Sequence, residues 1–100
     1  MSLFGEFMGT LFGSSTKYSS NQKSLSRQML YKLVSENSIT SLTKDEAILV
    51  RDVIDRARRG DAYISILQID EELSYLKNNG KISYNDYQSL MKIFSEYFSK

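Results

Sequence analysis

Two short stretches, 42–47 (LTKDEA) and 82–87 (ISYNDY), follow one pattern forty positions apart and decide most of the fold. Each begins with an apolar residue, continues with Thr or Ser, has an acid three positions later and ends on an apolar residue. This spacing is typical of a helix N-terminus, where the hydroxyl oxygen accepts a hydrogen bond from the third backbone N–H. The flanking apolar pair favours a hydrophobic staple across the first turn. The two stretches therefore predict helices capped by Thr43 and Ser83.

Apolar residues continue from these starts at steps of three and four, which predicts an all-α fold. We expect a small bundle of about four helices, over about 24–36, 43–59, 62–78 and 83–98. The third range is the most ambiguous, because residues 63–67 (YISIL) also fit a strand. Helical spacing from Ile66 to Leu76 favours a helix throughout that range. The chain has no Pro and only five Gly, so little in it interrupts helices.

The first thirteen residues form a separate amphipathic segment, here called the arm. On a helical wheel, one half of the arm is apolar, and the other half holds Glu6 and the glycines. The apolar half consists of Leu3, Phe4, Phe7, Met8, Leu11 and Phe12. A helix of about three turns with several glycines is not stable alone in water, so the arm needs a surface to lie against.

Three interpretations of the arm remain open: it packs on the body of its own protein or on a neighbouring subunit, it lies in a membrane interface, or it stays disordered until a partner binds. Gly5, Gly9 and Gly13 are spaced by four and allow close approach of another helix. Membrane-surface helices usually carry Lys or Arg on their polar face, whereas the arm carries only Glu6. Protein contact is therefore favoured. The expected organisation is an arm over 1–13, a Ser-rich flexible linker over 14–22 and a helical bundle domain over 23–100.

Composition excludes several kinds of chemistry. The chain has neither Cys nor His, which removes thiolate catalysis, zinc–thiolate sites and the commonest general base. Its acids at 70–72 and at 52 and 55 have no accompanying base, nucleophile or phosphate loop, so we interpret them as surface charge. We expect no enzyme activity, no cofactor and no bound metal.

No apolar run is long enough to span a membrane and no signal peptide is present, so a cytoplasmic or virion location is expected.

A basic cluster at the end of the second predicted helix is a candidate phosphate contact. The cluster consists of Arg51, Arg56, Arg58 and Arg59. Asp52 and Asp55 lie among these arginines, and the net charge of the chain is only +1. A solvated helix end, where cations interact favourably with the helix dipole, is the preferred interpretation of the cluster. Nucleic acid is therefore disfavoured as a partner.

The segment from about 66 to 94 resembles the short C-terminal domain family, SHOCT. The pattern shared with that family is a leucine-spaced helix, a Gly, an Ile with Ser, and then an acid with an aromatic. The residues that carry it are Leu73, Leu76, Gly80, Ile82, Ser83, Asp86 and Tyr87. Leu90 and Met91 depart from the lysines usual in the family and suggest a more buried second helix. The resemblance implies a helical hairpin used for contacts, and it implies no activity.

Seven Tyr and five Phe are more than a bundle of this size easily buries, so some are expected in an interface. We expect Phe94, Tyr97 and Phe98 to extend the contact made by the arm. The expected function is a non-enzymatic interaction or assembly protein of a bacterium or bacteriophage, such as a virion or secretion-apparatus subunit. We therefore expect the protein to be a homo-oligomer or a subunit of a larger assembly. Two alternatives stay open: a regulator or inhibitor that binds a host protein or DNA, and a peripheral membrane protein anchored by its N-terminal helix.

Overall fold

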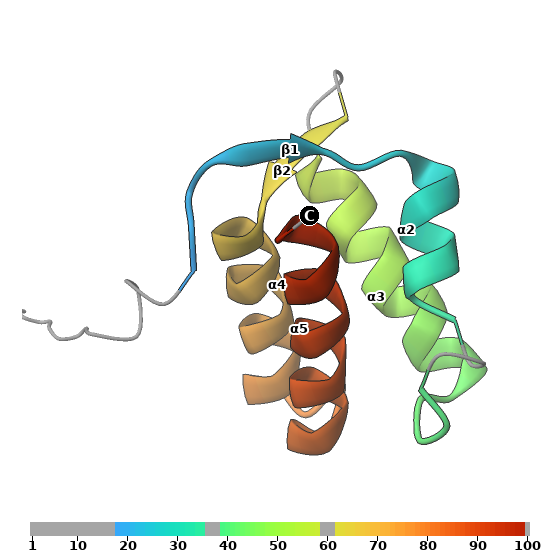
Figure 1. The fold of residues 1–100 in the computed structure, drawn as a ribbon. Helices are drawn as coiled ribbons and strands as arrows, with labels where there is room; N and C mark the ends of the chain where they lie inside the picture. The colour runs from blue at the N-terminus through green and yellow to red at the C-terminus, as the bar shows by residue number, and fades with distance from the viewer. Residues whose placement is uncertain (1–17, 36–38, 59–61, 100) are drawn as a thin grey trace, which may run out of the picture.

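The computed structural model describes residues 18–35, 39–58 and 62–99 of the chain. The described residues form a small, mostly helical bundle with one two-stranded sheet (Figure 1), which confirms the expected fold class. The elements are β1 (Gln22–Ser24), α2 (Arg27–Leu33), α3 (Lys44–Ala57), β2 (Tyr63–Ser65), α4 (Ile66–Asn78) and α5 (Tyr84–Phe98). The arm lies outside the described residues.

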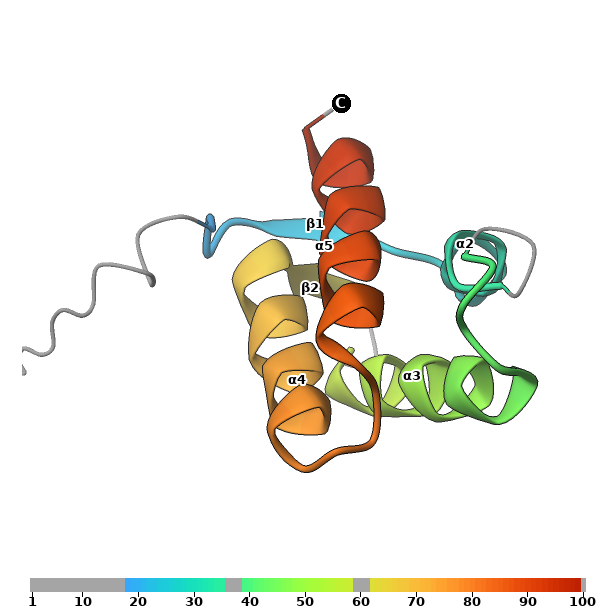
Figure 2. The same ribbon diagram turned by 90° about the horizontal axis from the view of Figure 1, so that it is seen from below.

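The helices α4 and α5 form an antiparallel hairpin, and α3 packs against α4. The short helix α2 packs on α3 and lies on the opposite side of the molecule from α4 in both views (Figures 1 and 2). Apolar residues of β2, of the four helices and of the connecting loops form one core. Its buried side chains are Leu25, Leu30, Val34, Ile39, Leu42, Ala47, Val50, Ile54, Ile64, Ile66, Ile69, Leu73, Leu76, Ile82, Leu90, Met91 and Phe94.

The two repeated stretches start helices as predicted. Thr43 caps α3 in a full capping box, in which its hydroxyl accepts from the Glu46 N–H and the Glu46 carboxylate accepts from the Thr43 N–H. Ser83 caps α5 by accepting from the N–H of Asp86, at 3.0 Å. The side chain of Asp86 differs from that of Glu46, because it is buried and accepts a hydrogen bond from the Ser41 hydroxyl.

The helix expected over 62–78 begins four residues later than predicted. Residues 63–65 form β2, which pairs antiparallel with β1 so that Ile64 lies opposite Lys23. The helical prediction is therefore wrong for 62–65, and the alternative strand pattern over 63–67 is correct for 63–65. Ser65 then caps α4 in a capping box with Gln68. The strand depends on a partner some forty residues earlier, which a local apolar period cannot reveal.

The first helix of the bundle is shorter than the predicted range 24–36. Its N-terminal side is taken by the sheet, because Ser24 pairs with Tyr63 and the Leu25 N–H donates to the Ala62 carbonyl at 2.9 Å. Ser26 caps α2, and the helix ends at Leu33. Backbone groups that pair in a sheet are not available for a helix.

The extended chain from Tyr18 to Ser24 crosses the ends of the helices and joins the α4 side of the molecule to α2 (Figure 1). Tyr18 is half-buried and packs against the core, and the Leu67 N–H donates to the Ser19 carbonyl at 3.1 Å. Within the predicted linker, residues 18–22 thus contact the bundle, and 14–17 lie outside the described residues. No helix among the described residues is both long and apolar enough to cross a membrane.

Candidate functional site

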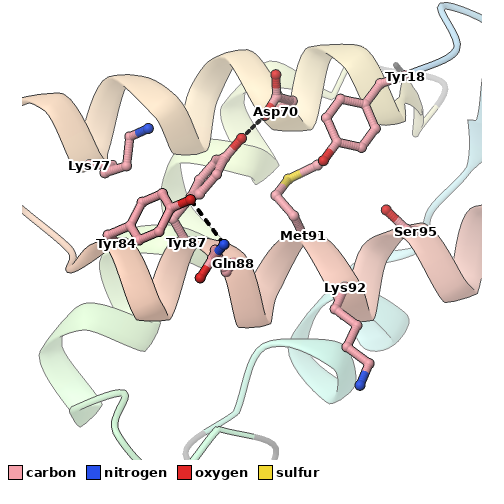
Figure 3. Close-up of a pocket in the computed structure, with 9 residues that line it drawn as sticks. All are labelled: Tyr18, Asp70, Lys77, Tyr84, Tyr87, Gln88, Met91, Lys92 and Ser95. Carbon is pink, nitrogen blue, oxygen red and sulfur yellow. Dashed lines mark hydrogen bonds between the residues drawn. The ribbon is translucent and has the colours of Figure 1, made fainter. Parts of the chain in front are cut away.

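A groove with a volume of about 520 Å³ lies along the α4–α5 hairpin (Figure 3). α5 supplies most of its wall, α4 supplies the opposite wall, and the start of the described chain closes one end. The residues that line it are Tyr18, Asp70, Lys77, Tyr84, Tyr87, Gln88, Met91, Lys92 and Ser95. We call this the hairpin groove.

The two walls of the hairpin groove are joined by a polar contact. The Tyr87 hydroxyl donates a hydrogen bond to the Asp70 carboxylate, and the Ser74 hydroxyl lies 3.5 Å from the same oxygen. Burial, together with the hydrogen bond to Asp70, raises the pKa of Tyr87 from 10.0 to about 12. The phenol is therefore protonated at neutral pH and acts as a hydrogen-bond donor, so it is poorly suited to act as a base.

Aromatic rings and a lysine form the other end of the hairpin groove. The Tyr84 and Tyr87 rings stack with centroids 6.3 Å apart. The ammonium of Lys77 lies 4.5 Å from the Tyr87 centroid and 5.5 Å from that of Tyr84. Tyr84 is still 58 % exposed, although Gln88 donates to its hydroxyl. The Tyr84 ring is thus open to solvent at this end of the groove, beside the half-buried ring of Tyr87.

A second depression, of about 360 Å³, adjoins the hairpin groove at its Tyr18 end. The two share Tyr18 and Ser95 as lining residues. The remaining residues of the second depression are Ser19, Ile66, Phe98 and Ser99. Together the two depressions form one extended concave surface, with apolar and aromatic groups in its floor and Lys, Gln and Ser at its rim.

The three aromatic residues predicted for partner contact occupy different environments. Phe94 is fully buried in the core, so its prediction as a contact residue is wrong. The spacing that placed it on the aromatic face of the helix is also the spacing of core residues. The Tyr97 hydroxyl donates to the Ser24 carbonyl at 2.9 Å, and the Phe98 ring packs edge-on against Tyr97. Phe98 is half-buried and lines the second depression, so it alone of the three lies in the candidate site.

The six predicted contact residues of the arm, from Leu3 to Phe12, lie outside the described residues.

Three of the four arginines predicted for phosphate contact make side-chain contacts within the described part of the chain. Arg51 lies over the Tyr31 ring, 4.5 Å from its centroid, and Arg56 forms an ion pair with Asp52 at 3.4 Å. Arg59 lies outside the described residues.

Arg58 has a structural role at the end of α3. Its side chain is only 10 % exposed, and its guanidinium pairs with Asp55 and donates to the Leu25 carbonyl at 2.7 Å. A guanidinium so placed holds the start of the bundle and has few donors left for a phosphate.

The sequence did not single out Asp70, Lys77 or Tyr84 as members of one site. A weak signal was present, because Tyr75, Tyr84 and Tyr87 cluster around the turn between the last two helices. Among the described residues, no group of acids is arranged to hold a metal ion. The concave surface offers chemistry for binding, with aromatic faces, a methionine and two rim lysines.

Comparison with known protein families, with curated proteins and with solved structures gives no match for this chain.

Proposed function

We propose that the protein is a non-enzymatic protein–protein interaction protein that takes part in assembly. The arm, with its six apolar residues, binds a neighbouring subunit, and the hairpin groove is the surface that receives such a helix. The proposed setting is a bacterium or a bacteriophage, with the chain as a cytoplasmic or virion subunit, and this part rests on size and on the arm alone.

The observation that carries the proposal is the open aromatic floor of the hairpin groove. A domain that closes its core usually leaves only scattered apolar side chains on its surface. Here Tyr84 and Tyr87 lie together beside Lys77, in a concavity rather than on a convex face. Tyrosine and methionine are enriched in protein interfaces, and a groove between two helices is a common receptor for an amphipathic helix.

The two alternative functions have weaker support. DNA binding by a small regulator would need several unopposed cations, whereas Arg58 is nearly buried against Asp55, Asp52 pairs with the exposed Arg56, and the net charge of the chain is only +1. Membrane anchoring would use the apolar face of the arm, whose polar face lacks the cations typical of such helices. Both alternatives enter the test below as separate outcomes.

The test measures the molar mass of the full chain by light scattering, from about 10 μM to about 1 mM. At about 1 mM, the arms of other chains are as concentrated as an arm that a short linker attaches to its own bundle, so contacts between chains can compete with contacts within one chain. We expect the mass to rise above the 11.5 kDa of one chain as this limit is approached. Phe7→Glu should abolish the rise, because it places a charge on the apolar face of the arm.

Gly9→Glu is the matched control, because it adds the same charge to the opposite face of the arm. It should preserve the rise, and Glu also favours a helix more than Gly does. If Gly9→Glu abolishes the rise and Phe7→Glu does not, the glycine face is the contact. A constant mass of one chain contradicts assembly through the arm. Binding to lipid vesicles, or to duplex DNA at low salt, would then favour the membrane or the regulator alternative.

A further inference from the structure

We propose that in the isolated chain the arm lies as a helix in the hairpin groove of its own bundle. The proposal rests on the proposed function for the role of the arm, and it names the surface that the arm covers before a partner is met. A neighbour would then have to displace the arm or exchange arms with it.

The concave surface has the shape that a single apolar helix face requires. Met91 lies in the middle of its floor and is 3 % exposed, with Tyr87 on one side and Tyr18 on the other (Figure 3). The floor continues past Ser95 into the second depression, where Ile66 and Phe98 lie. Methionine and aromatic side chains adapt to an apolar ligand without strict shape matching. Three apolar side chains from one face of a docked helix can therefore contact this floor in a row.

The length of the arm matches the length of the groove. Along α5, the lining residues run from Tyr84 to Ser95, a distance of about 16 Å at 1.5 Å per residue. A helix over residues 2–12 is about 15 Å long by the same measure. Its apolar positions recur at the three- and four-residue steps by which helices anchor in grooves, as at Phe4, Phe7 and Leu11.

The described chain starts at the groove itself. Tyr18 lines both depressions, and the hydrogen bond from Leu67 to Ser19 fixes the backbone there. Residues 13–17 can span up to about 17 Å, so the end of the arm can reach the floor beside Tyr18. A tether this short gives an effective concentration in the millimolar range. The arm of the same chain is therefore favoured over that of a second copy at ordinary concentrations.

The charges of the arm and of the groove are compatible. Lys77 and Lys92 line the groove, and neither forms an ion pair with another described residue. The only charged side chain of the arm is Glu6. Asp70 also lines the groove, but its carboxylate accepts the Tyr87 hydroxyl, so the two lysines make the groove better suited to an acidic helix than to a basic one.

The experiment uses the absence of tryptophan from the chain. Phe7→Trp places a single fluorescent reporter on the apolar face of the arm in the full-length protein. At about 10 μM, far below the effective concentration of the tether, we expect blue-shifted emission, slow quenching by acrylamide and the mass of one chain. Tyr84→Glu or Ser95→Glu, added to this reporter, should shift the emission to the red and raise the quenching constant several-fold.

Tyr75→Glu is the matched control on the same hairpin. Tyr75 is 64 % exposed and does not line the groove, so its replacement should leave the reporter buried. Far-UV circular dichroism checks that each variant keeps its helices. Two groove variants are used so that the loss of one to misfolding still leaves a result.

A complementation step identifies the receptor. The Phe7→Trp, Tyr84→Glu chain is mixed with the Phe7→Glu chain, whose groove is intact and whose arm is disabled. Burial of the reporter should return as the second chain approaches about 1 mM, the effective concentration that the tether provides. No return of burial overturns the assignment of the groove as receptor.

The remaining outcomes are equally decisive. A reporter that is solvent-exposed in the parent variant overturns the proposal, as does an equal effect of Tyr75→Glu and Tyr84→Glu. Burial that appears only as the mass rises, or only with vesicles, assigns the arm to a second copy or to a membrane. Failure of the proposed function looks different, because the reporter would then be buried in a chain that never assembles.

Discussion

The Tyr87 hydroxyl on α5 donates a hydrogen bond to the Asp70 carboxylate on α4, across the floor of the hairpin groove. The two residues are seventeen positions apart, on the two arms of the helical hairpin. Ser74, one turn after Asp70, brings a second hydroxyl to the same carboxylate oxygen. This contact therefore fixes the spacing of the two helices at the point where the groove is open.

Replacing Tyr87 with Phe should lower the free energy of unfolding by about 1–2 kcal/mol at pH 7, because the half-buried Asp70 loses its strongest donor. The pH dependence has a definite sign. The folded state raises the Tyr87 pKa from 10.0 to about 12, so the stabilisation is fully present below pH 10 and is lost as the pH rises toward 12. Urea denaturation followed by circular dichroism measures both effects.

Tyr84→Phe is the control for this contact, because the Tyr84 hydroxyl only accepts from Gln88 at the surface. It should change the unfolding free energy by less than about 0.5 kcal/mol. Parallel stability curves for wild type and Tyr87→Phe between pH 10 and 12 would contradict the assignment of the raised pKa to this contact.

A second prediction concerns Ser41 and Asp86. The Asp86 side chain is 3 % exposed, and the Ser41 hydroxyl reaches it from a loop 45 residues earlier. Ser41→Ala should cost about 2 kcal/mol of unfolding free energy, because a buried carboxylate loses a donor. Thr40→Ala, at the exposed neighbouring position, should be nearly neutral. Equal effects of the two substitutions in thermal or urea unfolding would argue against the contact.

The third prediction separates Arg58 from Arg56. Arg58→Ala should lower the unfolding free energy by about 2–3 kcal/mol, since it removes bonds to Asp55 and to the Leu25 carbonyl. Arg56→Ala should cost less than about 0.5 kcal/mol, because its ion pair with Asp52 is exposed. Chemical denaturation of both variants at pH 7 checks this. A larger loss in Arg56→Ala would contradict the structural role given to Arg58.

Acid sensitivity follows from the same contact. The hydrogen bond from Arg58, opposed in part by burial, lowers the pKa of Asp55 below its usual 3.8, and Arg27 adds to the effect. The stabilisation is present above pH 3.8 and is lost as the pH falls through the lower folded value. Wild type should therefore lose more stability than Arg58→Ala when the pH falls below about 4. Identical acid unfolding profiles would refute this linkage.

The fourth prediction exploits two residues with left-handed backbone. Gly80 has φ 71° in the turn after α4, and Ala62 has φ 66° just before β2. Ala62→Gly should raise the unfolding free energy by up to about 1 kcal/mol, since an alanine there is strained. Gly80→Ala should lower it by about 1 kcal/mol, although open space surrounds the position. The same sign of change for both variants in thermal unfolding would contradict the backbone assignment.

Local sequence signals account for most of the helical fold. The Ser and Thr caps at 43 and 83 and the apolar steps from Ile66 to Leu76 depend on residues at most four apart, so a linear reading detects them. The strands are different, because Lys23 and Ile64 meet only when the whole bundle has formed. The residues of the candidate site are likewise only partly predictable, because Asp70 and Lys77 on α4 meet Tyr84 on α5 only when the two helices pack.

By itself, the sequence determined where α3 and α5 begin, which faces of the helices are apolar, and that the chain carries no Cys or His chemistry. Only the tertiary structure decided that Phe94 is buried while Tyr84 is open, that Arg58 pairs with Asp55, and that α4 and α5 enclose a groove. The physical reason is the sequence distance over which each interaction acts. Capping and helical periodicity act over a single turn, whereas burial, ion pairing and concavity depend on which segments the folded chain brings together.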